Sequence, residues 1–391
     1  MYSDANGTRF GGPAAFAVAA ILVSAGAHAE IVWSGDFNDH DFSNYHTNSD
    51  PNVVAFHLVP PYGRPPQYGY QHPAHVGNGD LLSLVDSPTR GSKYSARFVV
   101  KSKAGGGVEP ADCDPALDCS TRRSQLQMTS TLLEYYNAIP QGAERWMSIS
   151  FFIPENYDGS GGGFGPVLWG SKSSSQNKPG TFGIWAEDGQ WQIIHRYYSR
   201  RMHEQGVDFR PSWWLTFEYS TEFPSADNWA QGLVDFPDVE ASRAALSNLN
   251  RGSWTDFIWH FKTDVDEFED NTGFLDVWMR AGSGEWVHVL KIRPMKDLAR
   301  VSTWPETSPE RVFDRGIGQY GPGGYTSQMG LYMDRDRVWG HDENMVIYMD
   351  NHKIGDENAT FADMSHDGSA PGKPPPTADV PPNPPVIVEN D

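Results

Sequence analysis

Short segments in which apolar and polar residues alternate recur along this chain, and they limit its fold more than any other feature of the sequence. Each mixes β-branched or aromatic residues with polar ones at a period of two, and Gly, Pro, Asn or Asp bounds it. The ranges are 94–103, 145–154, 180–198, 254–264, 274–282 and 345–356. Such strands predict an all-β fold, a jelly-roll sandwich of two antiparallel sheets with a concave groove.

The same pattern predicts how some strands are connected. The stretches "EDGQW" and "AGSGEW" are typical of hairpin turns, which join neighbouring antiparallel strands. Helical periodicity is scarce, and residues 238–249 are the best candidate for a short inserted helix. The sequence has no internal repeat, so we expect one domain.

Both ends of the chain differ from its middle. Residues 1–29 contain an apolar run that is too short to span a bilayer and end in "AHA", which is typical of a cleaved signal peptide. Residues 369–391 are rich in Pro, which predicts an extended tail. We therefore expect one domain over residues 30–368, in a secreted protein, extracellular or periplasmic, that does not enter a membrane.

Charge is distributed unevenly along the chain. It has 50 acidic and 30 basic residues, a formal charge of −20, which argues against nucleic-acid binding because that requires a basic face. Residues 190–203, "QWQIIHRYYSRRMH", nevertheless gather Arg, His and Tyr after a strand-like run. Because a local basic cleft can bind an anion within an acidic protein, this cluster predicts part of a groove for an acidic polymer. The 14 Trp residues are either core or platforms for sugar rings.

The chain has two cysteines, Cys113 and Cys119. In an exported protein, we expect them to form a disulfide across a short loop. A metal site would need more ligands than two cysteines at this spacing.

Several motifs occur in an order that resembles a known family. They include "WSGDFNDHDFSNY", "GSKYSARFVVKS", "RRSQL", "AERWMSISFFIPENY", "GSWTDFIWHFKTD", "MGLYM" and "VIYMDNHKIGDENATFADM", and they extend from about Trp33 to Met364. The chain resembles secreted jelly-roll polysaccharide lyases, in particular the heparin lyase I and glucuronan lyase group, with alginate lyases more distant. The resemblance implies β-elimination on a polysaccharide that contains uronic acid, with no cofactor required for the chemistry.

The resemblance also implies two catalytic residues. The family's Arg-x-Glu motif corresponds to Arg123 and Gln125 in "RRSQL", and its Lys-x-Gly-x-Tyr motif corresponds to Gln328 and Tyr332 in "QMGLY". Arg123 would bind a carboxylate or sulfate. Tyr332 would transfer protons, for which it needs nearby cations, because the pKa of an unperturbed Tyr is about 10.

The family's Gln-x-His motif has no direct counterpart here. It corresponds to Gly170 and Lys172 in "VLWGSK", so the usual neutralising residue and base are replaced. His195, expected on the next strand, is the candidate base in their place. The candidate substrate-binding residues are Lys172, Arg196, Arg200, Gln125, Gln328 and Tyr198.

The resemblance further implies a structural calcium. Asp36 and Asp350 are the candidate ligands, although solvated acidic loops are the alternative interpretation of such residues. We expect a monomer whose partner is an acidic polysaccharide.

Two other functions remain open at this point. The replacements at Gly170, Lys172 and Gln328 also suit a carbohydrate-binding protein that has lost the chemistry. A glycoside hydrolase on the same fold would need two carboxylates that flank a cleft.

Overall fold

The computed structural model describes residues 31–35, 37–38, 82–100, 123–127, 139–140, 142–157, 162–163, 167–170, 182–187, 189–196, 216–219, 234–235, 239–263, 273–292, 325–332 and 344–372.

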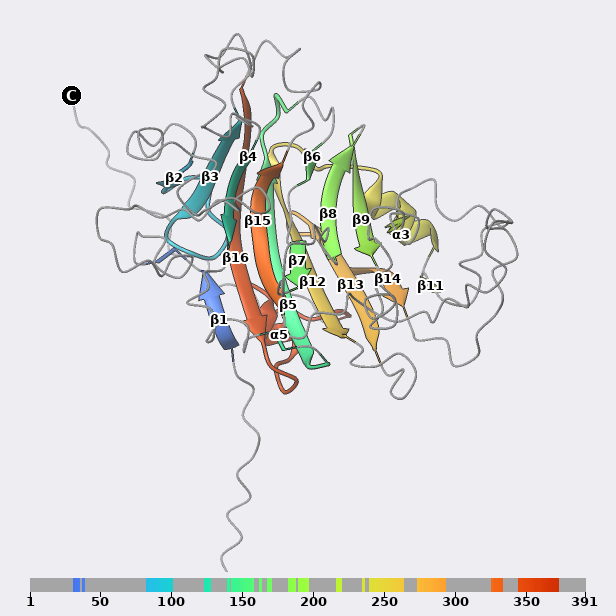
Figure 1. Cartoon of the computed structure of the whole chain (residues 1–391). Coiled ribbons are helices and arrows are strands. Elements are labelled where there is room, and N and C mark those ends of the chain that lie inside the picture. The colour runs from blue at the N-terminus through green and yellow to red at the C-terminus, as the bar shows by residue number, and fades with distance from the viewer. Residues whose placement is uncertain are drawn as a thin grey trace, which may run out of the picture.

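Two antiparallel sheets make up most of this part of the chain, and they are stacked as two layers (Figure 1). Sheet A has the order β11-β14-β13-β12-β5-β16-β3-β2, with β1 beside β16. Its strands are β1 (Ile31–Gly35), β2 (Leu82–Val85), β3 (Ser95–Val100), β5 (Glu144–Ile153), β11 (Val234–Asp235), β12 (Ser253–Lys262), β13 (Phe274–Ala281), β14 (Val287–Ile292) and β16 (Met345–Gly355).

Sheet B is the smaller layer. It has the order β10-β9-β8-β6-β15-β4, and β7 also pairs with β15. Its strands are β4 (Arg123–Gln127), β6 (Gly162–Gly163), β7 (Val167–Gly170), β8 (Phe182–Glu187), β9 (Gln190–Arg196), β10 (Thr216–Tyr219) and β15 (Tyr325–Tyr332).

The main core lies between the two sheets. Trp191 of sheet B packs against Phe151 and Phe257 of sheet A, with ring centroids 5.8 and 5.1 Å apart. All three side chains are fully buried, and large aromatic side chains contribute much of the apolar area that a sandwich core removes from water. Met329 and Leu331 of β15 belong to the same cluster. One face of sheet B is therefore committed to packing.

The outer face of sheet A is also covered, by the segment that follows β16. Its short helix α5 (Phe361–Met364) begins with a capping box in which Thr360 and Asp363 satisfy each other's backbone. A second hydrophobic cluster lies beneath it, formed by Ile258, Ala359, Met364, Trp146, Trp278, Trp286 and Phe361. Sheet A is thus buried on both faces over β5, β12 and β13.

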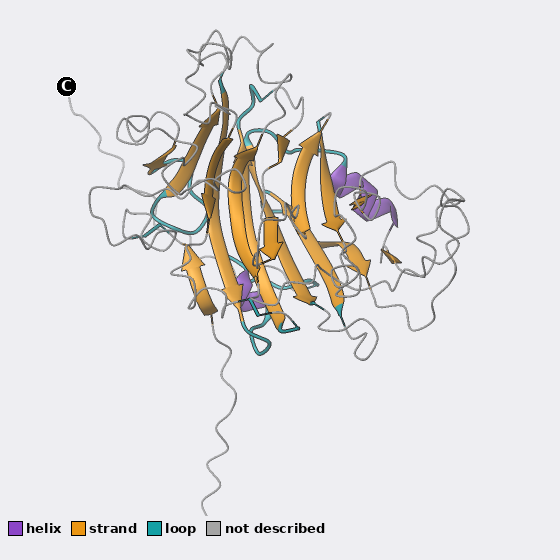
Figure 2. Cartoon of the chain, viewed as in Figure 1, coloured by secondary structure: helices purple, strands orange, loops and turns teal. Residues whose placement is uncertain are grey.

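Helices are few in the described part of the chain (Figure 2). Helix α3 (Val239–Leu246) contacts β13 and β14 of sheet A and β9 of sheet B, so it covers one end of the sandwich. No helix among these residues is long and apolar enough to cross a membrane.

The predicted fold class is confirmed by this architecture. Each of the six predicted ranges contains a strand or a hairpin, both predicted turns join strands, and the predicted helix at 238–249 is α3. The strands β2, β6, β10 and β11 were not predicted, because two to four residues are too few to show a period.

Candidate active site

Strand β15 shows which residues of sheet B face away from the core. Its residues Ser327, Met329 and Leu331 are buried, with at most 1% of their surface exposed. Because successive residues of a strand lie on opposite faces, Gln328 and Tyr332 occupy positions on the other face. We call this the outer face of sheet B.

One row of paired residues crosses the outer face. Tyr332 pairs with Arg123 of β4 on one side and with Gly163 of β6 on the other. Gly163 pairs in turn with Trp185 of β8, and Trp185 pairs with Gln192 of β9. Directly opposite residues of antiparallel strands lie on the same face, with Cβ atoms about 4.5–5.5 Å apart. We call these five residues the outer row.

Burial in the hairpin formed by β8 and β9 agrees with this assignment. Trp185 and Gln192 are partly exposed, whereas the alternating residues Ile184 and Ile193 are fully buried. The row therefore places Arg123 and Tyr332, the two residues implied by the resemblance, next to each other at its β4 end. Trp185 lies two strands from Tyr332 in the same row.

The two glutamines that replace charged residues of the family pattern also lie on the outer face. Gln125 pairs with Gly330, and Gln328 pairs with Gln127 and with Val167 of β7. Gly330 has a φ of 122°, a backbone conformation that strongly favours glycine. The two glutamine positions thus continue the outer face along β4 and β15 from the Arg123–Tyr332 pair.

The register separates the two predicted residues of β9. His195 pairs with Phe182 and Phe217, and it alternates with the buried Trp191 and Ile193, which places it on the core face. Arg196 alternates with Gln192 and lies on the outer face, opposite Thr216. The register thus separates the two positions, and the roles of Arg196 in binding and of His195 as base both stay predictions.

The strand β7 carries the segment that corresponds to the family's Gln-x-His motif. Gly170 pairs with Tyr325, and Leu168 pairs with the buried Ser327, so both fall on the core face. The alternate residue Trp169 pairs with Thr326 on the outer face. This register does not favour Gly170 as the counterpart of a glutamine that faces the substrate.

Several predicted residues lie outside the described part of the chain. They are Lys172, Tyr198 and Arg200 of the predicted substrate-binding set, the calcium candidate Asp36, and the cysteines Cys113 and Cys119.

A buried histidine supports β15 from behind. His352 of β16 lies in the core, with its Nε2 3.2 Å from Ser327 Oγ of β15. Its ring also makes an edge contact with Trp33, at 4.6 Å between centroids. Burial lowers the pKa of His352 to about 3, so this histidine is neutral at neutral pH. It joins the two sheets directly behind the strand that carries Gln328 and Tyr332.

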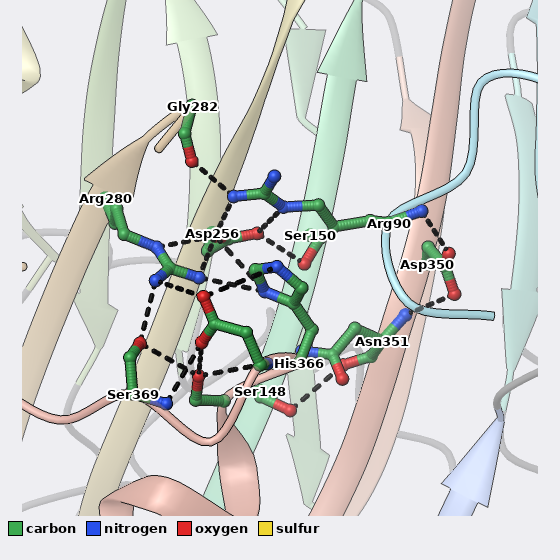
Figure 3. Close-up of polar contacts among 12 residues, drawn as sticks. Arg90, Ser148, Ser150, Asp256, Arg280, Gly282, Asp350, Asn351, His366 and Ser369 are labelled. Atoms are coloured by element: carbon green, nitrogen blue, oxygen red, sulfur yellow. Dashed lines mark hydrogen bonds and ion pairs between the residues drawn. The ribbon is translucent and has the colours of Figure 1, made fainter. Parts of the chain in front are cut away.

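Asp256 of β12 is the centre of a charged network on the outer face of sheet A (Figure 3). It accepts hydrogen bonds from Arg90 at 2.7 and 3.0 Å and from Arg280 at 2.9 and 3.0 Å. Ser150 Oγ of β5 donates to the same carboxylate at 2.8 Å. One buried carboxylate thus joins β5, β12, β13 and the loop before β3.

The partners of Asp256 favour the ionised form of its carboxylate. Burial alone would raise its pKa, but the hydrogen bond and the charge of Arg90, with a smaller contribution from the charge of Arg280, lower the pKa overall. The side chains of Asp256 and Arg280 are each only 2% exposed. Removal of one partner would therefore leave a buried charge without compensation.

The network also holds the C-terminal segment. Arg280 donates to Asp367 at 2.9 Å, to Ser369 Oγ at 2.7 Å and to His366 Nδ1 at 2.8 Å. An arginine has no acceptor, so Nδ1 must be unprotonated, in agreement with burial lowering the pKa of His366 to about 4. Its approach of 3.6 Å to Asp256 is therefore not an ion pair at neutral pH. Ser369, the first residue of the predicted tail, is itself buried.

Asp350 serves the same kind of structural role. Its carboxylate accepts hydrogen bonds from the backbone N–H groups of Arg90, Ser92 and Asn351 and from Ser92 Oγ. Both oxygens are occupied by donors, which is a poor fit to a calcium ligand. Among the described residues, no three His, Cys, Asp or Glu side chains are grouped so that they could hold a metal. With Asp36 outside this part of the chain, calcium binding stays a prediction.

Sequence reasoning missed Trp185 and Gly163. The signal for Trp185 was present, because the turn "EDG" fixes the register of its hairpin and alternation then separates it from Ile184. Gly163 gave no signal, because β6 is two residues long and lies in a run of glycines.

Comparison with known proteins identifies the family. No curated protein matches the chain significantly, but the family model described as polysaccharide lyase matches residues 61–353, which include the whole outer row. An endo-β-1,4-glucuronan lyase from the fungus Trichoderma reesei is 12% identical, with 74% of this chain and 90% of that chain covered and a TM-score of 0.41.

Two alginate lyases are also similar in structure. The one from Aplysia kurodai is 9% identical, with 83% of this chain and 99% of that chain covered and a TM-score of 0.41. The one from Pseudomonas aeruginosa is 12% identical, with 73% and 91% covered and a TM-score of 0.34. Because the family model spans most of the sequence, this chain belongs to the polysaccharide lyase family.

Proposed function

We propose that this protein cleaves a uronic-acid-containing polysaccharide by β-elimination on the outer face of sheet B. The observation that carries the proposal is the direct pairing of Tyr332 with Arg123 on the sheet face opposite the core. Family membership supports the reaction class. The structural neighbours named above cleave glucuronan and alginate, which are both uronic-acid polymers.

The two residues suit the two requirements of the reaction. The proton on C5 of a uronate is weakly acidic until the adjacent carboxylate is neutralised, and the planar guanidinium of Arg123 provides two donors for that carboxylate. Tyr332 takes the C5 proton. The electron pair forms the C4–C5 double bond, the C4–O bond breaks, and a proton goes to the leaving oxygen.

The position of the arginine also bears on the protonation of the tyrosine. A cation within about 4–6 Å favours the charged form of an acid and lowers its pKa. Arg123 and Tyr332 pair directly across β4 and β15, so the arginine would help Tyr332 to act as a base. The gain is greatest when the substrate excludes water from the site.

The remaining proposals about function rest on the sequence alone. We propose that residues 1–29 direct export, that Cys113 and Cys119 form a disulfide, and that the protein acts as a monomer on an acidic polysaccharide. Lys172, Tyr198, Arg196 and Arg200 would extend the groove beyond β9.

One observation favours a second function, that of a carbohydrate-binding protein without catalysis. Gln125 and Gln328 occupy outer-face positions where the family pattern has charged residues. Amides bind sugar hydroxyls well, but they stabilise developing charge less than ions do.

A panel of acidic polysaccharides distinguishes the two functions. Glucuronan, alginate, heparin and an exopolysaccharide that contains uronic acid would each be incubated with the protein, and the ultraviolet absorbance of the unsaturated uronate would be followed. A rise in absorbance with one of them establishes β-elimination. New reducing ends without absorbance would show hydrolysis, and binding without either would show a carbohydrate-binding protein.

A further inference from the structure

Among the described residues, the middle position of the outer row is a glycine. Tyr332 and Trp185 lie on either side of Gly163, which has no side chain. Adjacent strands are about 4.7–4.9 Å apart, so the two aromatic residues are separated by roughly 9–10 Å across the sheet. This spacing between the two positions is about the width of one sugar ring.

Trp185 is placed on one side of this glycine. Its side chain is partly exposed, and it lies on the face of the sheet opposite the packed core. The position two residues earlier on β8, on the same face, is Gly183, so neither the preceding position on its strand nor the facing position on β6 carries a side chain. Gln192, the next residue of the row, is also partly exposed and brings an amide beside the indole.

We propose that Trp185 and Gly163 form a sugar-stacking subsite, which binds the ring adjoining the uronate held at Arg123 and Tyr332. The assignment rests on the proposed function for the location of the reacting uronate. The flat indole contacts the apolar C–H face of the ring, and the amide of Gln192 bonds to a hydroxyl group. The subsite recognises the shape of a sugar ring and not its charge, in contrast to the Arg123 end of the row.

The proposal assigns stacking to Trp185 and proton transfer to Tyr332, and this separation has a kinetic consequence. A stacking contact is present in the ground state and in the transition state alike, so its loss should weaken binding and leave the chemical step nearly unchanged. The chemical step depends on Tyr332, two strands away.

The test compares Trp185→Ala with Trp185→Phe, and Gly163→Ala with Gly163→Val. Binding of glucuronan and alginate hexasaccharides would be measured by calorimetry, separately from cleavage by absorbance. We expect Trp185→Ala to weaken binding about tenfold with kcat changed less than about threefold, and Trp185→Phe to retain most of the affinity. Gly163→Val should weaken binding more than Gly163→Ala, because it adds the larger side chain between the two aromatic positions.

Gln190→Ala is the matched control. Gln190 is on the same strand and face as Gln192 but one step further from Tyr332, in the pair with Glu187. We expect it to bind and cleave like the unaltered protein. Thermal melting of every variant shows whether the fold is intact.

The outcomes separate the subsite from the reaction. If the protein cleaves a polymer and Trp185→Ala binds the hexasaccharides normally, the subsite is wrong and the lyase function stands. If the protein binds but cleaves nothing, and Trp185→Ala loses that binding, the subsite stands and β-elimination is wrong. Absence of binding to both hexasaccharides by the unaltered protein overturns the subsite as well.

Discussion

Tyr332 of β15 lies directly opposite Arg123 of β4, on the face of sheet B that points away from the core. The pair brings together two residues that are far apart in the sequence. A guanidinium can neutralise a carboxylate and a phenol can transfer protons, which are two functions that β-elimination next to a carboxylate uses.

Replacement of Tyr332 by Phe should lower kcat by about 100-fold or more, the usual scale for loss of a general acid or base. The ring is kept, so melting temperature and oligosaccharide affinity should change little. Tyr348→Phe is the matched control, because Tyr348 lies in sheet A and packs against Phe152. Full activity of Tyr332→Phe would show that this tyrosine is not the proton-transfer residue.

Replacement of Arg123 by Ala should weaken binding and turnover together, because the proposed contact of its guanidinium is with a charge that is present in both the ground state and the transition state. Arg123→Lys should restore part of the binding but less of the rate, since lysine lacks the planar pair of donors. The exposed Arg243 of α3 provides the control, as Arg243→Ala. Salt titration of KM should give a shallower slope for Arg123→Ala than for the control.

The pair His195→Ala and Arg196→Ala tests the register of β9. His195 shares the core face with Trp191 and Ile193, so its replacement should lower the melting temperature and leave kcat largely intact. Arg196→Ala should instead raise KM at an unchanged melting temperature. A large fall in kcat for His195→Ala, without destabilisation, would identify that histidine as the base.

Replacement of Asp256 by Asn should destabilise the fold strongly. Arg90 and Arg280 would lose the carboxylate that compensates them, and removal of one partner from a buried ion pair typically costs about 3–5 kcal/mol. Urea unfolding measures the change. Glu357→Gln is the control, because its pair with Arg145 is on the surface, with Glu357 58% exposed, and such pairs contribute about 0–1 kcal/mol. Similar stability of the two variants would contradict the role given to Asp256.

The protein should begin to lose stability as the pH falls below about 6.5, before most carboxylates become protonated. The pKa of His366 is lowered to about 4 and that of His352 to about 3, both from 6.5. Between these values and 6.5 the unfolded chain binds more protons than the folded one, so stability falls as the pH falls. Melting at about pH 7 and about pH 5 should show this fall, and His366→Gln should reduce it. An identical fall in the variant would mean that His366 does not contribute.

The sequence predicted the fold well because its long strands carry a clear period of two. Ranges such as 254–264 and 345–356 appear almost unchanged as β12 and β16. The roles proposed for Arg123 and Tyr332 came from motifs, but their direct opposition could not be predicted, because the register between strands so far apart in the sequence depends on packing.

The role of His195 as base stays a prediction. The register of β9, counted from the buried Trp191, assigns its position to the core face. The network around Asp256 gave no signal, since Arg90, Asp256, Arg280 and His366 come from four separate segments whose convergence depends on the tertiary fold.

The covering of sheet A by the segment after β16 has a consequence for engineering the protein. Residues Trp146, Trp278 and Phe361 are committed to that packing, so a substitution in sheet A is restricted from both sides. Trp185 and Gln192, on the outer face of sheet B, are instead partly exposed. A library intended to change which polymer is cleaved should therefore vary those positions alone, and the C-terminal segment should be retained through Ser369 in every member.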